Sequence, residues 1–333
     1  MNALLSFGAI VALLAVAWLG ADLAGLKVVF GIVIPYLALA VFIGGIIFRI
    51  WKWAKAPVPF RIPTSCGQQK SLDWIKHDKL ENPHTTLGVI GRMALEILFF
   101  RSLYRNTKTD LQKGPRLVYG NTKWLWLAGL AFHWSFLFIL LRHLRFFSDP
   151  VPFFVLWLQE IDGFFQIFVP VLYMTDLVII GALTYLFLRR VVIPQIRYIS
   201  LAADYFPLFL ILGIAVSGVL MRYFIKVNVM DVKELTMSLV AFKPAIPEGD
   251  GIGLVFWIHL LFVCTLVAYF PFSKLMHAGG VFLSPTRNLT NNSREERHIN
   301  PWDYDVKVHT YEEYEDEFRD LMKGAGLPLE KEK

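Results

Sequence analysis

Long hydrophobic runs alternate with polar connections along this chain. Six of these runs are long enough for helices that cross a lipid bilayer, which takes about 20 apolar residues. They lie near 3–24, 27–51, 122–146, 163–188, 201–224 and 252–276. The sequence therefore predicts an all-α membrane protein built as a six-helix transmembrane bundle. No Lys or Arg precedes the first run and a second run follows at once, which favours a retained hairpin over a signal peptide.

Basic residues in the connections predict the orientation of the bundle. The segment 52–120 holds twelve Lys and Arg, whereas the loop 148–162 holds none. Since Lys and Arg concentrate in cytoplasmic loops, both termini are expected in the cytoplasm. The loop before the last span fits this distribution of charge less well, because it contains Lys226, Lys233 and Lys243. The net charge of +6 is then explained by the basic residues of the cytoplasmic segments, and no nucleic-acid partner is expected.

The polar stretches divide the chain into four predicted parts. These are a transmembrane hairpin at 1–51, a basic cytoplasmic insert at 52–121, a four-helix membrane core at 122–277 and an acidic cytoplasmic tail at 278–333. Within the insert, Thr85–Tyr104 mixes apolar and charged residues and predicts an interfacial helix, with a seventh span as the alternative. In the tail, apolar residues recur at helical spacing around Thr310–Asp320, as expected of a solvated acidic helix or of a helix that docks on a cytoplasmic subunit.

Histidines on two hydrophobic runs are the candidate functional residues. His133 and His143 lie on the third run, and His259 and His277 on the sixth. Because these two helices are predicted to be antiparallel, His133 meets His277 at the inner end and His143 meets His259 at the outer end. Each pair supplies two imidazoles for one haem iron, which gives two haem b stacked across the bilayer. The separations, about 15 Å and 27 Å along straight helices, are unequal, and Pro271 is expected to kink or end the sixth helix.

Roles other than haem binding fit these histidines less well. The four side chains could hydrogen-bond between helices without a metal, but two pairs in one antiparallel arrangement favour haem over that alternative. Zinc or copper fits poorly because no Cys, Asp or Glu stands beside them at ligand spacing. No CxxCH motif for covalent haem attachment occurs, and Cys66 and Cys264 are expected to be structural. His77, His84, His298 and His309 are expected to be surface residues.

The histidine spacing, the stretch Pro271-Phe-Ser-Lys-Leu-Met-His277 and the later Ser284-Pro285 resemble the gamma subunit of respiratory nitrate reductase. The extra leading span and the basic insert make the chain more similar to the DsrM cytochromes of the sulfite-reduction-associated Dsr membrane complex, or to the cytochrome b of membrane-bound heterodisulfide reductase. The resemblance implies the same pairing of histidines in two haems. It implies electron exchange between menaquinone, as an exchangeable substrate, and a cytoplasmic iron–sulfur partner of the heterodisulfide reductase type, in a prokaryotic inner membrane. Further membrane and periplasmic cytochrome subunits are then expected as partners.

Charged residues near the outer pair are weaker candidates. Quinol oxidation needs a proton acceptor, for which Glu160, Asp162 and Asp176 are candidates, with Asp176 expected deep within the fourth span. Arg142 and Arg145 flank His143 and are candidates for pairing with haem propionates, or they extend to the outer headgroups. The alternative functions are the cytochrome b of a nitrate reductase or heterodisulfide reductase complex, and a non-redox anchor or transporter.

Overall fold

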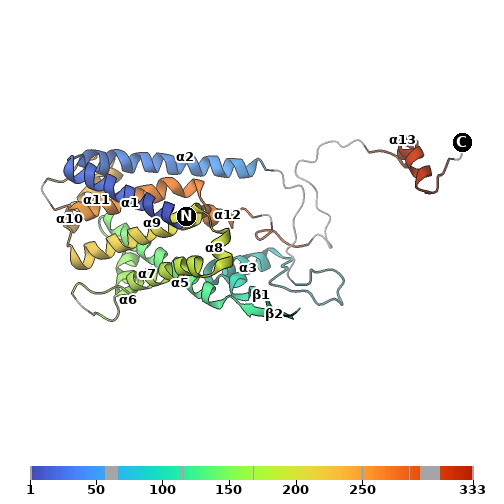
Figure 1. Ribbon diagram of the computed structural model, residues 1–333, viewed down its shortest axis with the longest axis horizontal. Helices are drawn as coiled ribbons and strands as arrows, with labels where there is room; N and C mark the ends of the chain where they lie inside the picture. The colour runs from blue at the N-terminus through green and yellow to red at the C-terminus, as the bar shows by residue number, and fades with distance from the viewer. Residues whose placement is uncertain are drawn as a thin grey trace.

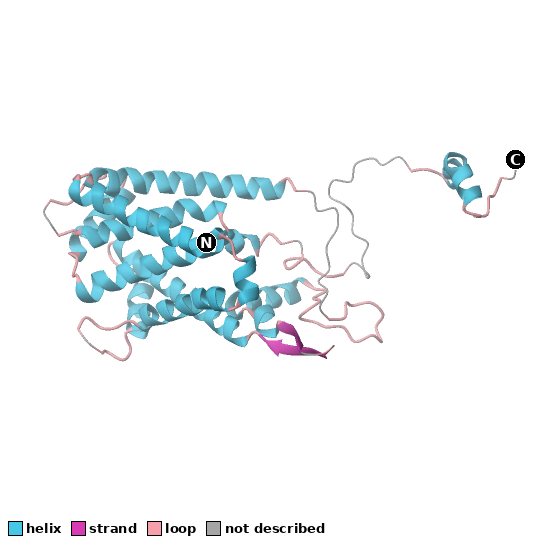
Figure 2. Ribbon diagram, in the orientation of Figure 1, coloured by secondary structure: helices cyan, strands magenta, loops and turns pink. Residues whose placement is uncertain are grey.

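Long helices lie side by side in one bundle, and most of the short elements lie at its two ends (Figure 1; Figure 2). The computed structural model describes residues 2–56, 67–112, 114, 116–167, 169–248, 251–284, 286–292 and 308–331. The long helices are α1 Asn2–Ala17, α2 Ile34–Ala54, α5 Lys123–His143, α7 Met174–Val192, α9 Ala202–Val219 and α11 Leu254–Tyr269. In space α5 packs on α7, α7 on α9, and α9 on both α1 and α11, while α2 packs on α11.

Five of these helices, counted with the helical turns that continue them, are long and apolar enough to cross a membrane. These segments are Asn2–Leu23, Val29–Ala54, Lys123–Phe146, Ala202–Phe224 and Leu254–Phe272. Many of their large apolar side chains are exposed on the outside of the bundle, as a lipid-facing surface requires. The all-α membrane bundle predicted from the sequence is therefore confirmed.

The fourth predicted span, 163–188, is wrong at its start. The helix α7 begins only at Met174, and the chain from Gly163 to Tyr173 is not helical where it is described. Pro170 lacks an amide hydrogen and disfavours helical backbone in the residue before it, which keeps this stretch from extending the helix. Helix α7 is less apolar than the five membrane-crossing segments, because Asp176 lies near its start and Arg189 and Arg190 lie near its end. It nevertheless packs between α5 and α9.

The two loops expected at the outer end contain short helices that the sequence analysis did not predict. Helix α6 spans Phe153–Asp162, and helix α10 spans Val229–Val240 with Asn228 capping its first turn. Leu235 of α10 is fully buried, and Thr236 donates a hydrogen bond to the backbone of Phe146, in the 3₁₀ turn that follows α5. This end of the bundle is therefore covered by packed helices.

The basic insert folds at the opposite end of the bundle (Figure 1). Helix α3, Thr86–Phe99, is followed by the short α4, Arg101–Arg105, and by a hairpin of β1 Thr107–Gln112 and β2 Arg116–Asn121. The two strands pair antiparallel, with Thr107 opposite Asn121. The 14 residues of α3 extend about 21 Å, which is too short to cross a bilayer of about 30 Å, so the alternative of a seventh span there is wrong. The hairpin was not predicted.

Three further helices join or follow the long ones in the described part of the chain. Helix α8, Pro194–Ile199, joins α7 to α9, and α12, His277–Gly280, follows the end of α11. In the tail, α13 spans Tyr311–Gly324, so the helix predicted there is confirmed. Its first turn is closed by Thr310 and Glu313, which each accept a hydrogen bond from the other's backbone amide.

Candidate functional site: two facing histidine pairs

The histidines paired by the sequence argument lie opposite one another in the bundle. The ring centroids of His133 and His277, the inner pair, are 5.9 Å apart, with the ring planes at 81°. The ring centroids of His143 and His259, the outer pair, are 6.3 Å apart, with the planes nearly parallel at 9°. The role of these four side chains as haem ligands stays a prediction, but the structure brings together the two pairs on which it depends.

Hydrogen bonds at Nδ1 fix the orientation of all four rings. Nδ1 lies 2.7 Å from the carbonyl oxygen of Gly129 in His133, 2.6 Å from that of Ile139 in His143, and 2.8 Å from that of Lys274 in His277. A carbonyl only accepts, so each of these rings carries its proton on Nδ1. In His259, Nδ1 lies 2.9 Å from the hydroxyl of Ser217. No hydrogen bond within the described part of the chain engages Nε2 of these four residues, so Nε2 is left as the donor atom for a metal.

The spacing within each pair suits two axial ligands of one metal. A metal–imidazole bond of about 2 Å, with about 1.1 Å from nitrogen to ring centroid, places two such rings about 6 Å apart. His133, His143 and His277 are exposed. Among the described residues no three His, Cys, Asp or Glu side chains gather to hold a bare metal ion. Two imidazoles therefore fit a haem, whose porphyrin supplies the other four iron ligands.

A break in the sixth long helix places His277 opposite His133. Helix α11 ends at Tyr269, and two short 3₁₀ turns, Phe270–Phe272 and Lys274–Met276, lead to His277. Pro271 is buried, and its carbonyl accepts a hydrogen bond from Arg49 Nε at 3.0 Å. Pro271 therefore ends the helix, as predicted, and His277 lies beyond this end.

A buried ion-pair network stands beside the outer pair. Arg142, next to His143, lies 3.1 Å from Oδ2 of Asp162 and 3.0 Å from Oδ1 of Asp176. Asp162 also accepts hydrogen bonds from the backbone and the hydroxyl of Thr175, and Tyr223 donates its hydroxyl proton to Asp176 at 2.8 Å. The network links α5, α6, α7 and the end of the α9 segment.

This network changes the interpretation of several candidates. Asp176 lies in the first turn of α7, not deep within a span, because the helix begins at Met174; the helix dipole favours a carboxylate there. The Arg142 guanidinium is engaged with Asp162 and Asp176, so it is not directed to the headgroups. Arg145 lies over the ring of Phe146, and Glu160 is exposed on α6.

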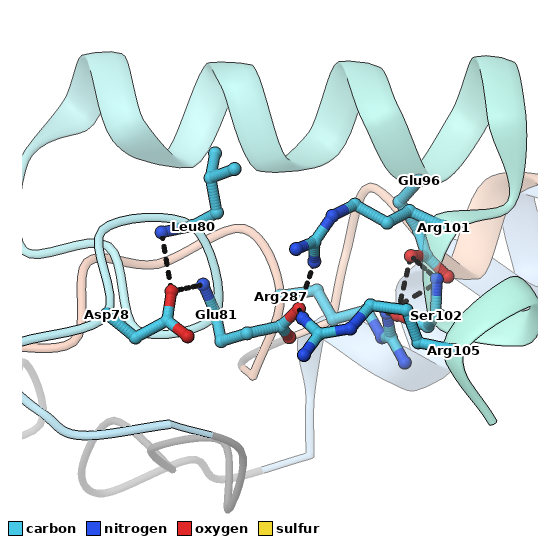
Figure 3. Close-up of polar contacts among 8 residues, drawn as sticks. All are labelled: Asp78, Leu80, Glu81, Glu96, Arg101, Ser102, Arg105 and Arg287. Atoms are coloured by element: carbon cyan, nitrogen blue, oxygen red, sulfur yellow. Dashed lines mark hydrogen bonds and ion pairs between the residues drawn. The ribbon is translucent and has the colours of Figure 1, made fainter. Parts of the chain in front are cut away.

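Polar contacts join residues of the insert to one another and to Arg287 (Figure 3). Arg287 forms an ion pair with Glu96 at 3.0 Å and donates a hydrogen bond to Ser102 at 2.9 Å. Glu81 pairs with both Arg101 and Arg105. The insert is thereby tied to the segment that follows His277, and the ring of Phe100 packs edge-on against His133, with 4.9 Å between centroids.

The remaining predicted positions divide between described and undescribed parts of the chain. Cys264 is buried with a free thiol, while Cys66 and His298 lie outside the described residues. His309 is exposed as expected, but His77 is only partly exposed and packs against His84, with 4.8 Å between ring centroids. Sequence reasoning missed Ser217, Thr175, Tyr223 and Arg287. Ser217 carried a signal, since Gly213 and Ser217 are small residues four apart within an apolar span.

The fold and the site define a helical membrane bundle with two facing histidine pairs. A family model for the nitrate reductase gamma subunit matches residues 93–294. The chain is also 49% identical over 281 residues to the Hdr-like menaquinol oxidoreductase cytochrome b-like subunit of Archaeoglobus fulgidus, covering 83% of this chain and 84% of that protein. The protein of the same name from Archaeoglobus profundus is 42% identical over 275 residues, covering 81% of each chain. The chain therefore belongs to the nitrate reductase gamma subunit family.

Proposed function

We propose that this protein is a membrane cytochrome b that holds one haem b at the inner pair and one at the outer pair. It exchanges electrons between menaquinone and a cytoplasmic iron–sulfur partner of the heterodisulfide reductase type. The observation that carries the proposal is the pair of ring separations, 5.9 Å and 6.3 Å, with every Nδ1 engaged and every Nε2 left for a metal. When bound, the haems supply one-electron transfer.

The two Archaeoglobus relatives support the quinol side of this proposal, since both are named menaquinol oxidoreductase subunits and Hdr-like. We assign the chain to dissimilatory sulfur metabolism, as its resemblance to the DsrM cytochromes implies. The iron–sulfur partner, with further membrane and periplasmic cytochrome subunits, belongs to the same assignment. The bundle lies in a prokaryotic inner membrane with both termini in the cytoplasm, because the insert carries the basic residues.

The charged residues near the outer pair have different roles in this proposal. Asp162 and Asp176 neutralise Arg142 and hold the end of α5, and with it His143, against α6 and α7. Glu160 is exposed and has no ion pair among the described contacts, so it is the one of the three acids free to accept a proton from quinol. Arg145 is the cation left for a haem propionate, because Arg142 is already paired.

A difference spectrum of the purified protein, reduced minus oxidised, tests the proposal. The wild type should show b-type haem at two per chain by pyridine haemochrome assay. His143→Ala should lose about half of the haem, because the inner pair does not use His143. His309→Ala is the matched control, since its exposed ring lies in the tail, and it should keep both haems.

Three results would contradict the proposal. They are wild-type protein without b-type haem after assembly with its complex, loss of both haems in His143→Ala, and full haem content in that variant. Identification of the subunits that purify with the chain separates the assignments. An iron–sulfur subunit of the heterodisulfide reductase type supports the proposed partner, and a molybdenum subunit supports nitrate reductase instead.

A further inference from the structure

One of the four histidines is held differently from the others. His133, His143 and His277 each place Nδ1 against a carbonyl of their own segment, three or four residues earlier. His259 places Nδ1 against the Ser217 hydroxyl, which belongs to another helix, α9. Ser217 is only 5% exposed, so water does not substitute for it.

The hydroxyl of Ser217 is placed so that it accepts from His259. Its oxygen lies 2.8 Å from the carbonyl of Gly213 and 3.0 Å from that of Ile214. A serine hydroxyl has one proton, and these carbonyls can only accept it. The hydroxyl oxygen therefore receives the Nδ1 proton of His259, which leaves the lone pair of this ring on Nε2.

Small residues on α9 bring Ser217 within reach of His259. A Cβ on Gly213 would lie 2.8 Å from the ring of Phe262, so glycine at this position lets α9 and α11 approach closely. Ser217 lies four residues after Gly213, on the same face of α9. On α11, His259 lies three residues before Phe262, so it comes opposite Ser217 when Phe262 is opposite Gly213. A Cβ on Gly218 would meet His259 Cε1 at 3.6 Å, so this position also adjoins the ring.

We infer that Ser217 is a positioning residue for His259 and sets the reduction potential of the outer haem separately from the inner one. This inference rests on the proposed function. A hydrogen-bond acceptor at Nδ1 fixes the ring orientation and raises the basicity of a metal-binding imidazole, and the loss of such a partner costs about 10–100-fold in metal affinity. Greater basicity at the ligand favours ferric iron and lowers the reduction potential. Removal of the hydroxyl raises it.

The test compares Ser217→Ala with Ser217→Thr and with Ser6→Ala. Thr keeps a hydroxyl that can bond the carbonyl four residues earlier and still accept from His259. Ser6 is equally buried, at 3% exposure, and its hydroxyl bonds the backbone of Ala202 between α1 and α9. Redox titration of the haem spectrum gives both potentials, and haem transfer to apomyoglobin gives the relative affinity at each pair.

In Ser217→Ala we expect a higher potential and a 10–100-fold weaker affinity for one haem, with the other unchanged. Ser217→Thr should restore both values, and Ser6→Ala should match the wild type. Equal potentials in Ser217→Ala and the wild type, equal changes at both haems, or no rescue by Ser217→Thr would overturn the inference. A wild-type protein that binds two haems while Ser217→Ala behaves like Ser6→Ala would overturn this inference alone and leave the proposed function standing.

Discussion

Arg142→Gln should be among the most destabilising single substitutions at the outer end of the bundle. The side chain of Arg142 is 9% exposed, and its two partners, Asp162 and Asp176, are 1% and 13% exposed. Removing the guanidinium leaves two carboxylates with little access to water. Loss of one partner from a buried ion pair costs about 3–5 kcal/mol, because the remaining charge is uncompensated.

The free energy of unfolding should therefore fall by about 3–5 kcal/mol in Arg142→Gln. At about 2–4 °C per kcal/mol, the midpoint of thermal unfolding drops by roughly 6–20 °C. Intrinsic tryptophan fluorescence of the protein in detergent follows this transition. Lys233→Gln is the matched control, because its partner Asp149 is 71% exposed and such a surface pair contributes less than about 1 kcal/mol.

A second variant separates the loss of charge pairing from the loss of packing. Asp162→Asn combined with Arg142→Gln removes one of the stranded charges, so the double variant should unfold at a higher temperature than Arg142→Gln alone. Equal midpoints for Arg142→Gln and Lys233→Gln would refute the reasoning. A double variant no more stable than Arg142→Gln would refute it as well.

Two further predictions follow from geometry and from a capped loop. With the two proposed haems bound, the oxidised protein should show two different low-spin ferric signals by electron paramagnetic resonance, because the ring planes cross at 81° in the inner pair and at 9° in the outer pair. Two identical signals would contradict this prediction. Hydrogen bonds from the backbone amides of Glu81 and Leu80 lower the pKa of Asp78 below its usual 3.8. The stability that Asp78 gives the loop is thus present above about pH 3.8 and lost as pH falls through the lowered pKa. Pepsin cleavage within 67–84 should rise over that acidic range in the wild type and show no such step in Asp78→Asn.

Local sequence patterns were enough to predict much of the fold. Apolar runs of sufficient length predicted five membrane-crossing segments with bounds within a few residues, since each helix satisfies its own backbone hydrogen bonds. The start of α7 was predicted wrongly because it depends on two other parts of the chain. One is Pro170, and the other is Asp162, which accepts a hydrogen bond from the backbone amide of Thr175, thirteen residues later. The β1–β2 hairpin was missed although the turn residue Gly114 stands between its two strands.

The partners of side chains in the site were less accessible to sequence reasoning. Arg142 was a candidate for pairing with haem propionates or with headgroups, and the ion pairs that it forms with α6 and α7, 20 and 34 residues further along the chain, were not predicted. Nothing in the local sequence distinguishes a buried ion pair from a charge directed to the membrane surface. The histidine pairs were easier to predict, because the antiparallel order of the two helices determines which histidine of one faces which histidine of the other.

The two histidine separations, ten residues and eighteen, are unequal, yet the structure brings both pairs face to face. Ten positions along α5 lead from His133 to His143, and ten along α11 lead from His259 to Tyr269, which is a rise of about 15 Å in each helix. Pro271 then ends the helix, and the 3₁₀ turns Phe270–Phe272 and Lys274–Met276 lead from Tyr269 to His277. A straight helix would place His277 about 12 Å beyond its partner, so the break is what makes a second facing pair possible.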